Sequence, residues 1–238
     1  TNIGTIAAQR IAFWTWEEIL TGATHNVLNS SGRRLRQLQD TGNYFGGAVW
    51  VNTNSGTAGI VAFVNGTYLA PVSDITDATT VAAAIPLNRF NITNASTIVI
   101  PTSYFGTVWL GDDWHVNLNG KALEHNTMIG ATVVGTATGE IDFVGCHITT
   151  VGVQPSEFSD CTLGGTITLT ASGTYVLRDC DASTAGQTDP VIEFDGAGVN
   201  LVNCRRWAGN IVLSSMLSGD VFEIGGTGKV TINPNCTS

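Results

Sequence analysis

The residues of this chain whose types and spacing could carry out chemistry are pairs of acids two positions apart. The pairs are Glu140 with Asp142, Asp179 with Asp181, and Glu193 with Asp195. Alternate residues of a β-strand share a face, with Cα atoms roughly 7 Å apart. Two carboxylates about 6.5–9.5 Å apart, one protonated and one ionised, can hydrolyse a glycosidic bond with inversion. The spacing permits glycosidase chemistry, but outward acids also keep a sheet soluble, so we assign no catalytic residue.

Three tryptophans are the next candidates, since Trp109, Trp114 and Trp207 each stand beside polar segments. A large aromatic ring has an apolar face that can bind a sugar ring if the ring is exposed. Large aromatic side chains are more often structural and substantially buried. We expect Trp109 and Trp114 to be half-buried supports beneath loops and all three to serve structural packing, with sugar binding as the alternative.

All five cysteines occur at the same place in a loose repeat, with Cys-to-Cys spacings of 15, 19, 24 and 32. The copies are GEIDFVGC, PSEFSDC, TYVLRDC, GVNLVNC and VTINPNC, which end at Cys146, Cys161, Cys180, Cys204 and Cys236. Three places earlier stand Phe143, Phe158, Leu177, Leu201 and, breaking the pattern, Asn233. One place earlier stand Gly145, Asp160, Asp179, Asn203 and Asn235.

The residue before each cysteine is of a type that tolerates the left-handed conformation of a sharp turn. A repeat with a fixed turn and variable loops is typical of a solenoid of short strands. We therefore interpret each copy as one turn of a right-handed parallel β-helix. The cysteines would then form a stacked inward column of reduced, buried thiols, because free cysteine packs as a small apolar group.

No metal or cofactor site is expected. A zinc site needs cysteines or histidines at close spacing, whereas His25, His115, His125 and His147 are scattered among the well-separated cysteines. The chain also has no glycine-rich nucleotide-binding loop and no recognisable order of nucleophile, base and acid.

The composition favours strands and turns over an ordinary mixed fold. Only 12% of the 238 residues are charged, against about 25% in a typical soluble domain, and 28 are glycine. No apolar run approaches the roughly 20 residues of a membrane-spanning helix, and no signal peptide is recognisable. We expect no membrane insertion.

Charge is distributed unevenly along the chain. The net charge is −9, yet residues 1–40 carry four arginines and three acids, which leaves six basic and sixteen acidic residues elsewhere. A body of this sign has no basic face for phosphates, so nucleic-acid binding is not expected. The cluster Arg33, Arg34 and Arg36 could contact an acidic partner or form local ion pairs on a helix.

Two short helices are predicted within residues 13–40. The first carries Trp16, Ile19 and Leu20, and the second carries Leu35 and Leu38. Each has only a thin apolar stripe, so neither can bury a core alone. They must pack on the body, on copies of themselves or on another protein, which suggests an assembly or attachment module.

The same stretch resembles a short module that recurs in virion proteins of tailed bacteriophages, in tail-tip, fibre and tailspike chains. The matching residues are Trp16, Glu18, Thr24, His25, Asn26, Ser30, Gly32, Arg33, Arg34, Leu35, Arg36 and Leu38. The resemblance covers about twenty-five residues. It implies a location in the virion and not a particular chemistry.

Residues 48–92 predict a strand with alternating Val49 and Val51, and then a helix. Ser73 can cap this helix, Asp74 and Asp77 would lie in its first turn, and Pro86 ends it. One face carries apolar side chains at helical spacing: Ile75, Ala78, Val81, Ala82 and Ile85. The arrangement resembles the start of phage β-helices, which implies a helix that covers the open end of the solenoid. An ordinary amphipathic helix in an α+β domain is the alternative.

The sequence thus predicts an all-β chain in three parts. Residues 1–47 form a helical attachment module, residues 48–92 form the first strand and capping helix, and residues 93–238 form the parallel β-helix. Five to eight turns fit between residue 48 and the last residue, with a lateral loop over 183–190. By analogy with the resembled family, we expect a homotrimer.

The expected function is that of a structural virion protein. It would be a tail fibre or tailspike-like subunit that attaches the phage to its host, with residues 1–47 bound to other virion proteins. One alternative is a polysaccharide depolymerase that uses paired carboxylates. Another is a non-catalytic module that binds host surface glycans.

Overall fold

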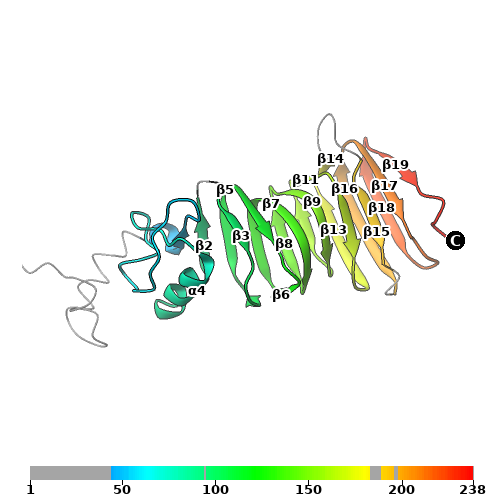
Figure 1. Ribbon diagram of the computed structural model, residues 1–238. Coiled ribbons are helices and arrows are strands. Elements are labelled where there is room, and N and C mark those ends of the chain that lie inside the picture. Colours follow the sequence, from blue (N-terminus) through cyan, green and yellow to red (C-terminus); the bar gives the residue numbers. More distant parts are fainter. Residues whose placement is uncertain (1–43, 94, 183–188, 196–197, 238) are drawn as a thin grey trace, which may run out of the picture.

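The computed structural model describes residues 44–237, apart from 94, 183–188 and 196–197. These residues form a parallel β-solenoid of about seven turns with one α-helix. Figure 1 shows the strands stacked along one axis, from β2 and helix α4 at one end to β19 and the C terminus at the other. The predicted all-β parallel β-helix is confirmed, whereas the predicted N-terminal helices lie outside the described residues.

The solenoid consists of short strands that follow one another closely along the chain. A 3₁₀ turn, η1 (Phe45–Gly47), precedes them, and α4 (Ile75–Ala84) interrupts them after the first strand. The strands are β1 (Val49–Val51), β2 (Arg89–Ile92), β3 (Thr97–Val99), β4 (Tyr104–Phe105), β5 (Val108–Asn117), β6 (Lys121–Glu124), β7 (Asn126–Thr138), β8 (Ile141–Val144), β9 (His147–Val153), β10 (Glu157–Ser159), β11 (Thr162–Leu163), β12 (Thr166–Leu169), β13 (Gly173–Arg178), β14 (Asp181–Ala182), β15 (Val191–Phe194), β16 (Asn200–Trp207), β17 (Asn210–Ser214), β18 (Val221–Gly226) and β19 (Lys229–Ile232).

One inward column of side chains runs the length of the solenoid. Parallel pairing in register places, from turn to turn, Val49, Phe90, Trp109, Met128, Phe143, Phe158, Leu177, Cys204 and Ile224 opposite one another. All but Ile224 are buried. Since alternate residues of a strand face inward, each turn contributes one member, and each member packs on the turn before and the turn after.

A second inward column lies at a sharp turn of the chain and contains three cysteines. Gly145, Asp160 and Asp179 have φ of 60°, 55° and 55°, and a buried cysteine follows each of them. Thr162 lies opposite both His147 and Asp181, which places the preceding Cys161 between Cys146 and Cys180. The predicted turn and thiol stack are therefore confirmed for these three copies.

The other two cysteines do not belong to this stack, and their predicted alignment was wrong. Cys204 lies opposite Leu177, so it belongs to the first column. Asn203 is a strand residue whose amide donates to Glu223, and the turn is made instead by Arg206, with φ of 55°. Cys236 follows the last strand and is only partly buried.

Trp207 occupies the place in the fourth copy that Cys204 was predicted to fill. It follows the left-handed Arg206, and the next residue, Ala208, pairs with Asp181, the neighbour of Cys180. Trp114 lies opposite Ala131 two turns before Cys146 in the same column. Trp114 and Trp207 thus stand at the two ends of a run of small residues in this column, Ala131, Cys146, Cys161 and Cys180.

Helix α4 has the predicted apolar face but a different cap. Ile75, Ala78, Val81 and Ala82 are buried in the core, and the helix packs against β1. The N-cap is Asp74, whose side chain accepts the Asp77 amide hydrogen at 2.8 Å, so the predicted cap by Ser73 was wrong. An aspartate at this position satisfies an otherwise unpaired amide of the first turn.

Strand β5 is continuous over ten residues but irregular in its middle. Asp113 adopts φ of 55°, and the pairing with β7 shifts register between Leu110 and Trp114. The acidic pair Asp112 and Asp113 therefore bends the strand without ending it, as a bulge does.

The last turn is the least covered part of the solenoid. Its strands β18 and β19 pair with β16 and β17 on one side. Ile224 and Ile232 are 40% and 66% exposed, whereas their counterparts in the preceding turn, Cys204 and Leu213, are buried.

Candidate functional site

The three tryptophans singled out from the sequence are core residues. Trp109 and Trp114 are 0% exposed and Trp207 is 1% exposed, so the expectation of half-buried supports underestimated the burial of Trp109 and Trp114. Their indole N–H groups donate internally, to Asn126 Oδ1, the Ile129 carbonyl and the Gly209 carbonyl, at 3.0, 3.0 and 3.2 Å. These rings serve packing and present no face to a ligand.

In two of the three acidic pairs, the two residues do not lie within one strand. Asp179 lies at the left-handed turn, where its carboxylate accepts from Arg206, while Asp181 begins the next strand. Glu193 is on β15 and accepts from the Thr168 hydroxyl at 3.2 Å, but Asp195 lies beyond the end of that strand. Neither pair converges on a recess.

The third pair belongs to a mixed group on the outer surface, which we name the Phe105 cluster. It consists of Phe105, His125, Glu140, Asp142 and Glu157. Phe105 is 71% exposed, and its ring lies edge-on to that of His125 at 5.4 Å between centroids. His125 Nδ1 lies 3.6 Å from Glu140 Oε2, and Asp142 lies opposite Glu157 in the ladder between β8 and β10.

The carboxylates of the Phe105 cluster influence one another. Partial burial raises the pKa of Asp142, the negative charges of Glu157 and Glu140 raise it further, and His125 opposes them. Glu157 is held by Arg178, with Nη2 and Oε1 3.2 Å apart. Two neighbouring acids with different environments are the arrangement that general acid–base chemistry requires. The exposed ring of Phe105 beside them offers an apolar face to a sugar.

Sequence reasoning missed Phe105 and His125 as members of this group. The two residues come from earlier turns than Asp142 and Glu157, and only the register of the turns brings them together. His125 adopts a left-handed conformation, with φ of 54°, and its ring lies beside the Glu140 carboxylate. Such a residue at a turn leaves only a weak signal in a sequence.

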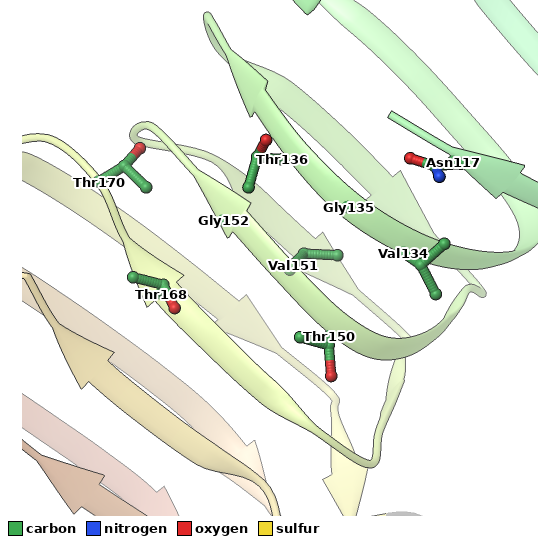
Figure 2. A pocket seen from close by; sticks show the side chains of 9 residues that line it. All are labelled: Asn117, Val134, Gly135, Thr136, Thr150, Val151, Gly152, Thr168 and Thr170. Carbon is green, nitrogen blue, oxygen red and sulfur yellow. The ribbon is translucent and has the colours of Figure 1, made fainter. Parts of the chain in front are cut away.

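A shallow recess of about 420 Å³ lies over β7, β9 and β12 (Figure 2). It is lined by Asn117, Val134, Gly135, Thr136, Thr150, Val151, Gly152, Thr168 and Thr170. Gly152 creates the hollow, because a Cβ there would stand 2.9 Å from the Thr136 methyl carbon. None of these described lining side chains is charged, so the recess has room for a ligand but offers it no acid or base for catalysis.

A third surface feature lies at the N-terminal end and is named the aromatic patch. It comprises Phe45, Trp50, Tyr68 and Leu69. The Tyr68 ring stands edge to face with Phe45 and Trp50, at centroid distances of 5.6 and 4.9 Å. Phe45, Tyr68 and Leu69 are 54%, 52% and 76% exposed.

Within the part of the chain that the structure describes, no three histidine, cysteine or acidic residues converge as metal ligands. No described helix is long and apolar enough to cross a membrane.

Comparison of the chain with protein-family models, with curated proteins and with solved structures finds no match. Function must therefore be argued from the residues of this chain.

Proposed function

We propose that this chain is a structural subunit of a tailed-bacteriophage appendage, a tail fibre or tailspike-like protein that attaches the virion to its host. The observation that carries the proposal is the uninterrupted inward column from Val49 to Cys204, which makes the solenoid a continuously packed rod. The resemblance of residues 16–38 to a virion module supports the same role.

A stiff shaft suits this role for physical reasons. Every turn hydrogen-bonds to its neighbours along the axis, and aromatic rings stack through the middle, as Phe143 and Phe158 do at 4.9 Å. Close packing of this kind resists compression and bending. In this proposal α4 covers the first turn of the shaft, residues 1–47 bind other virion proteins, and the opposite end points to the host.

The proposed assembly is a homotrimer. Its support is the low fraction of charged residues in the chain, 12%, because contact between copies then removes few charged groups from water. The uncharged recess around Gly135 and Gly152 is a surface against which a neighbouring shaft could lie.

Light scattering tests the proposal on two chains, one of residues 1–238 and one beginning at Tyr44. Tyr44 is kept because its hydroxyl accepts from the Phe63 amide and donates to the Asn65 carbonyl, both at 2.9 Å. A trimer that dissociates without residues 1–43 supports an assembly module in an appendage. A folded monomer in both chains would rule out the trimeric fibre.

A second candidate, glycan binding or hydrolysis, is favoured by the Phe105 cluster. Its exposed ring and adjacent carboxylates match what a sugar-binding surface offers. Screening against bacterial surface polysaccharides should then show binding that Phe105→Ala abolishes and Phe45→Ala leaves unchanged. If the chain also releases reducing ends, Glu140→Gln should abolish the release while Glu193→Gln retains it. Equal activity in both variants would exclude the cluster.

A further inference from the structure

Exposed apolar side chains are concentrated at the N-terminal end of the solenoid. Of the fourteen large apolar side chains that are exposed among the described residues, six lie within residues 45–69: Phe45, Ile60, Val61, Val64, Tyr68 and Leu69. The contacts of Tyr68 with Phe45 and Trp50 hold three rings in one arrangement. A preformed apolar cluster of this kind marks a surface that another group covers.

The aromatic patch also contains a buried hydrogen-bond donor that has no acceptor in the part of the chain that the structure describes. The indole Nε1–H of Trp50 is buried and has no hydrogen-bond acceptor among the described residues. The edge-to-face ring of Tyr68 is its neighbour. The patch therefore leaves exposed apolar area and one buried N–H group that lacks an acceptor among the residues that the structure describes.

The chain itself supplies a candidate to cover the patch. The 43 residues that precede Tyr44 include the stripe residues Leu35 and Leu38, which helical spacing places on one face and which need a surface on which to be buried. Leu38 is six positions before Tyr44, so a short connection keeps it near the patch. A short tether raises the effective concentration of a linked segment to about the millimolar range.

The attachment point of this tether is fixed beside the patch. The Tyr44 ring packs edge-on against Phe63 at 6.0 Å between centroids, and its hydroxyl is bonded to the loop that also carries Tyr68 and Leu69. Phe45, the next residue, is itself a member of the patch. The chain thus enters the described structure at the edge of the surface to be covered.

Charge favours the same pairing. Residues 1–40 have four basic and three acidic residues, whereas the remainder has six basic and sixteen acidic residues. A slightly basic segment with the cluster Arg33, Arg34 and Arg36 is attracted to an acidic body, and this long-range attraction favours association. At helical spacing Arg33 and Arg36 lie on a different face from Leu35 and Leu38, so these two arginines can remain in water while the leucines are buried.

We propose that the segment 30–40 of the same chain packs on the aromatic patch, with Leu35 and Leu38 placed against Phe45, Tyr68 and Leu69. The patch is then an intramolecular docking site that fixes the direction in which the N-terminal module leaves the solenoid. This inference does not depend on the virion role, since it concerns only how one chain covers its own surface.

Photo-crosslinking of the full chain tests the proposal directly. Benzoylphenylalanine is placed at Leu69, whose 76% exposure makes the substitution compatible with the fold, and in a control at Leu217, which is 43% exposed beyond β17. Irradiation should join position 69 to a peptide within residues 30–40 in a product of monomer mass. Position 217 should give no such product.

Matched variants define the contact. Leu35→Ser with Leu38→Ser should lower the yield of the crosslink at least tenfold, while Gln37→Ser, on the other face, should leave it unchanged. Mixing ¹⁵N-labelled and unlabelled chains identifies the source of the segment. Crosslinks between labelled and unlabelled copies would overturn the proposal in favour of exchange with a second copy, and absence of any product in residues 1–43 would overturn it outright.

The result is separable from the test of the proposed function. A monomeric mass for residues 1–238 in light scattering is compatible with an intramolecular crosslink, and failure of the crosslink leaves the oligomeric mass of the same chain unchanged. The two measurements therefore fail independently.

Discussion

The ring of Phe158 lies stacked on the ring of Phe143, with centroids 4.9 Å apart and planes inclined by 16°. Both rings are 0% exposed and occupy equivalent positions in consecutive turns. On its other side Phe158 faces Leu177. The core is thus a linear stack, in which each member has two neighbours along the axis and loss of one member leaves a gap that the others cannot close.

Replacement of one ring in the stack should be costly. Phe158→Ala removes a fully buried ring between two fixed turns, so we expect a loss of about 3–5 kcal/mol in the free energy of unfolding. The control is Phe105→Ala, at an exposed ring, which should change stability by less than about 0.5 kcal/mol. Denaturant titration measures both, and equal effects would contradict the stacked core.

Native thiol labelling should distinguish the cysteines. Cys146, Cys161, Cys180 and Cys204 are 1–2% exposed, whereas Cys236 is partly buried near the end of the chain. Burial raises the pKa of Cys204 to about 12, so its reactive thiolate is scarce at neutral pH. Ellman's reagent should therefore label one thiol quickly, and Cys236→Ser should abolish that phase. Fast labelling of several thiols would disprove the column.

Glycines should differ sharply in their tolerance of substitution. A Cβ at Gly165 would stand 1.1 Å from the Thr149 carbonyl oxygen, so Gly165→Ala must displace backbone and should cost about 3 kcal/mol or more. Gly145 has open space around it, and its counterparts in the next two turns are Asp160 and Asp179. Gly145→Asp should therefore remain within about 1 kcal/mol of the parent protein in thermal unfolding. The reverse order would indicate a different register.

Ionised Asp142 should reduce stability at neutral pH. Its pKa is raised from the ordinary 3.8 by partial burial and by Glu157 and Glu140, with His125 acting in the opposite sense. The folded state thus holds this proton more tightly than the unfolded state, and the cost of ionisation appears as pH rises through the raised pKa.

The substitution Asp142→Asn removes that cost. We expect a gain at pH 7 of no more than about 0.5 kcal/mol, because solvent screens this exposed group, and no gain below about pH 4. Asp195→Asn, on a different face, is the control and should show no such trend in melting temperature against pH. A gain that grows toward low pH would contradict the assignment.

The fold could be predicted from the sequence where residues of the same type recur from one turn to the next. Phe143, Phe158 and Leu177, and the turn residues before Cys146, Cys161 and Cys180, align because parallel turns in register place like residues in contact. The alignment failed at Cys204, because the segment between Cys180 and Arg206 is longer than in the earlier turns and a short motif cannot reveal how loop length is distributed.

The candidate sites were less predictable than the fold. The burial of Trp109 follows from its place between Phe90 and Met128, a relationship between turns that local pattern does not contain. The Phe105 cluster likewise combines residues from several turns. Its single signal in the sequence was the spacing of Glu140 and Asp142, which two other pairs share without forming a site.

The weakly covered last turn has a mechanical consequence. Leu201 lies opposite Val221, twenty residues later, so the last turn is a segment of about twenty residues that is stacked on the turn before it. A pull on Cys236 would unwind β19 and β18 first, because they are bonded on one side, whereas the first turn is held by α4 packed on β1. Each released turn of about twenty residues would lengthen the extended polypeptide by about 70 Å, and the pulling force would rise and fall once per turn.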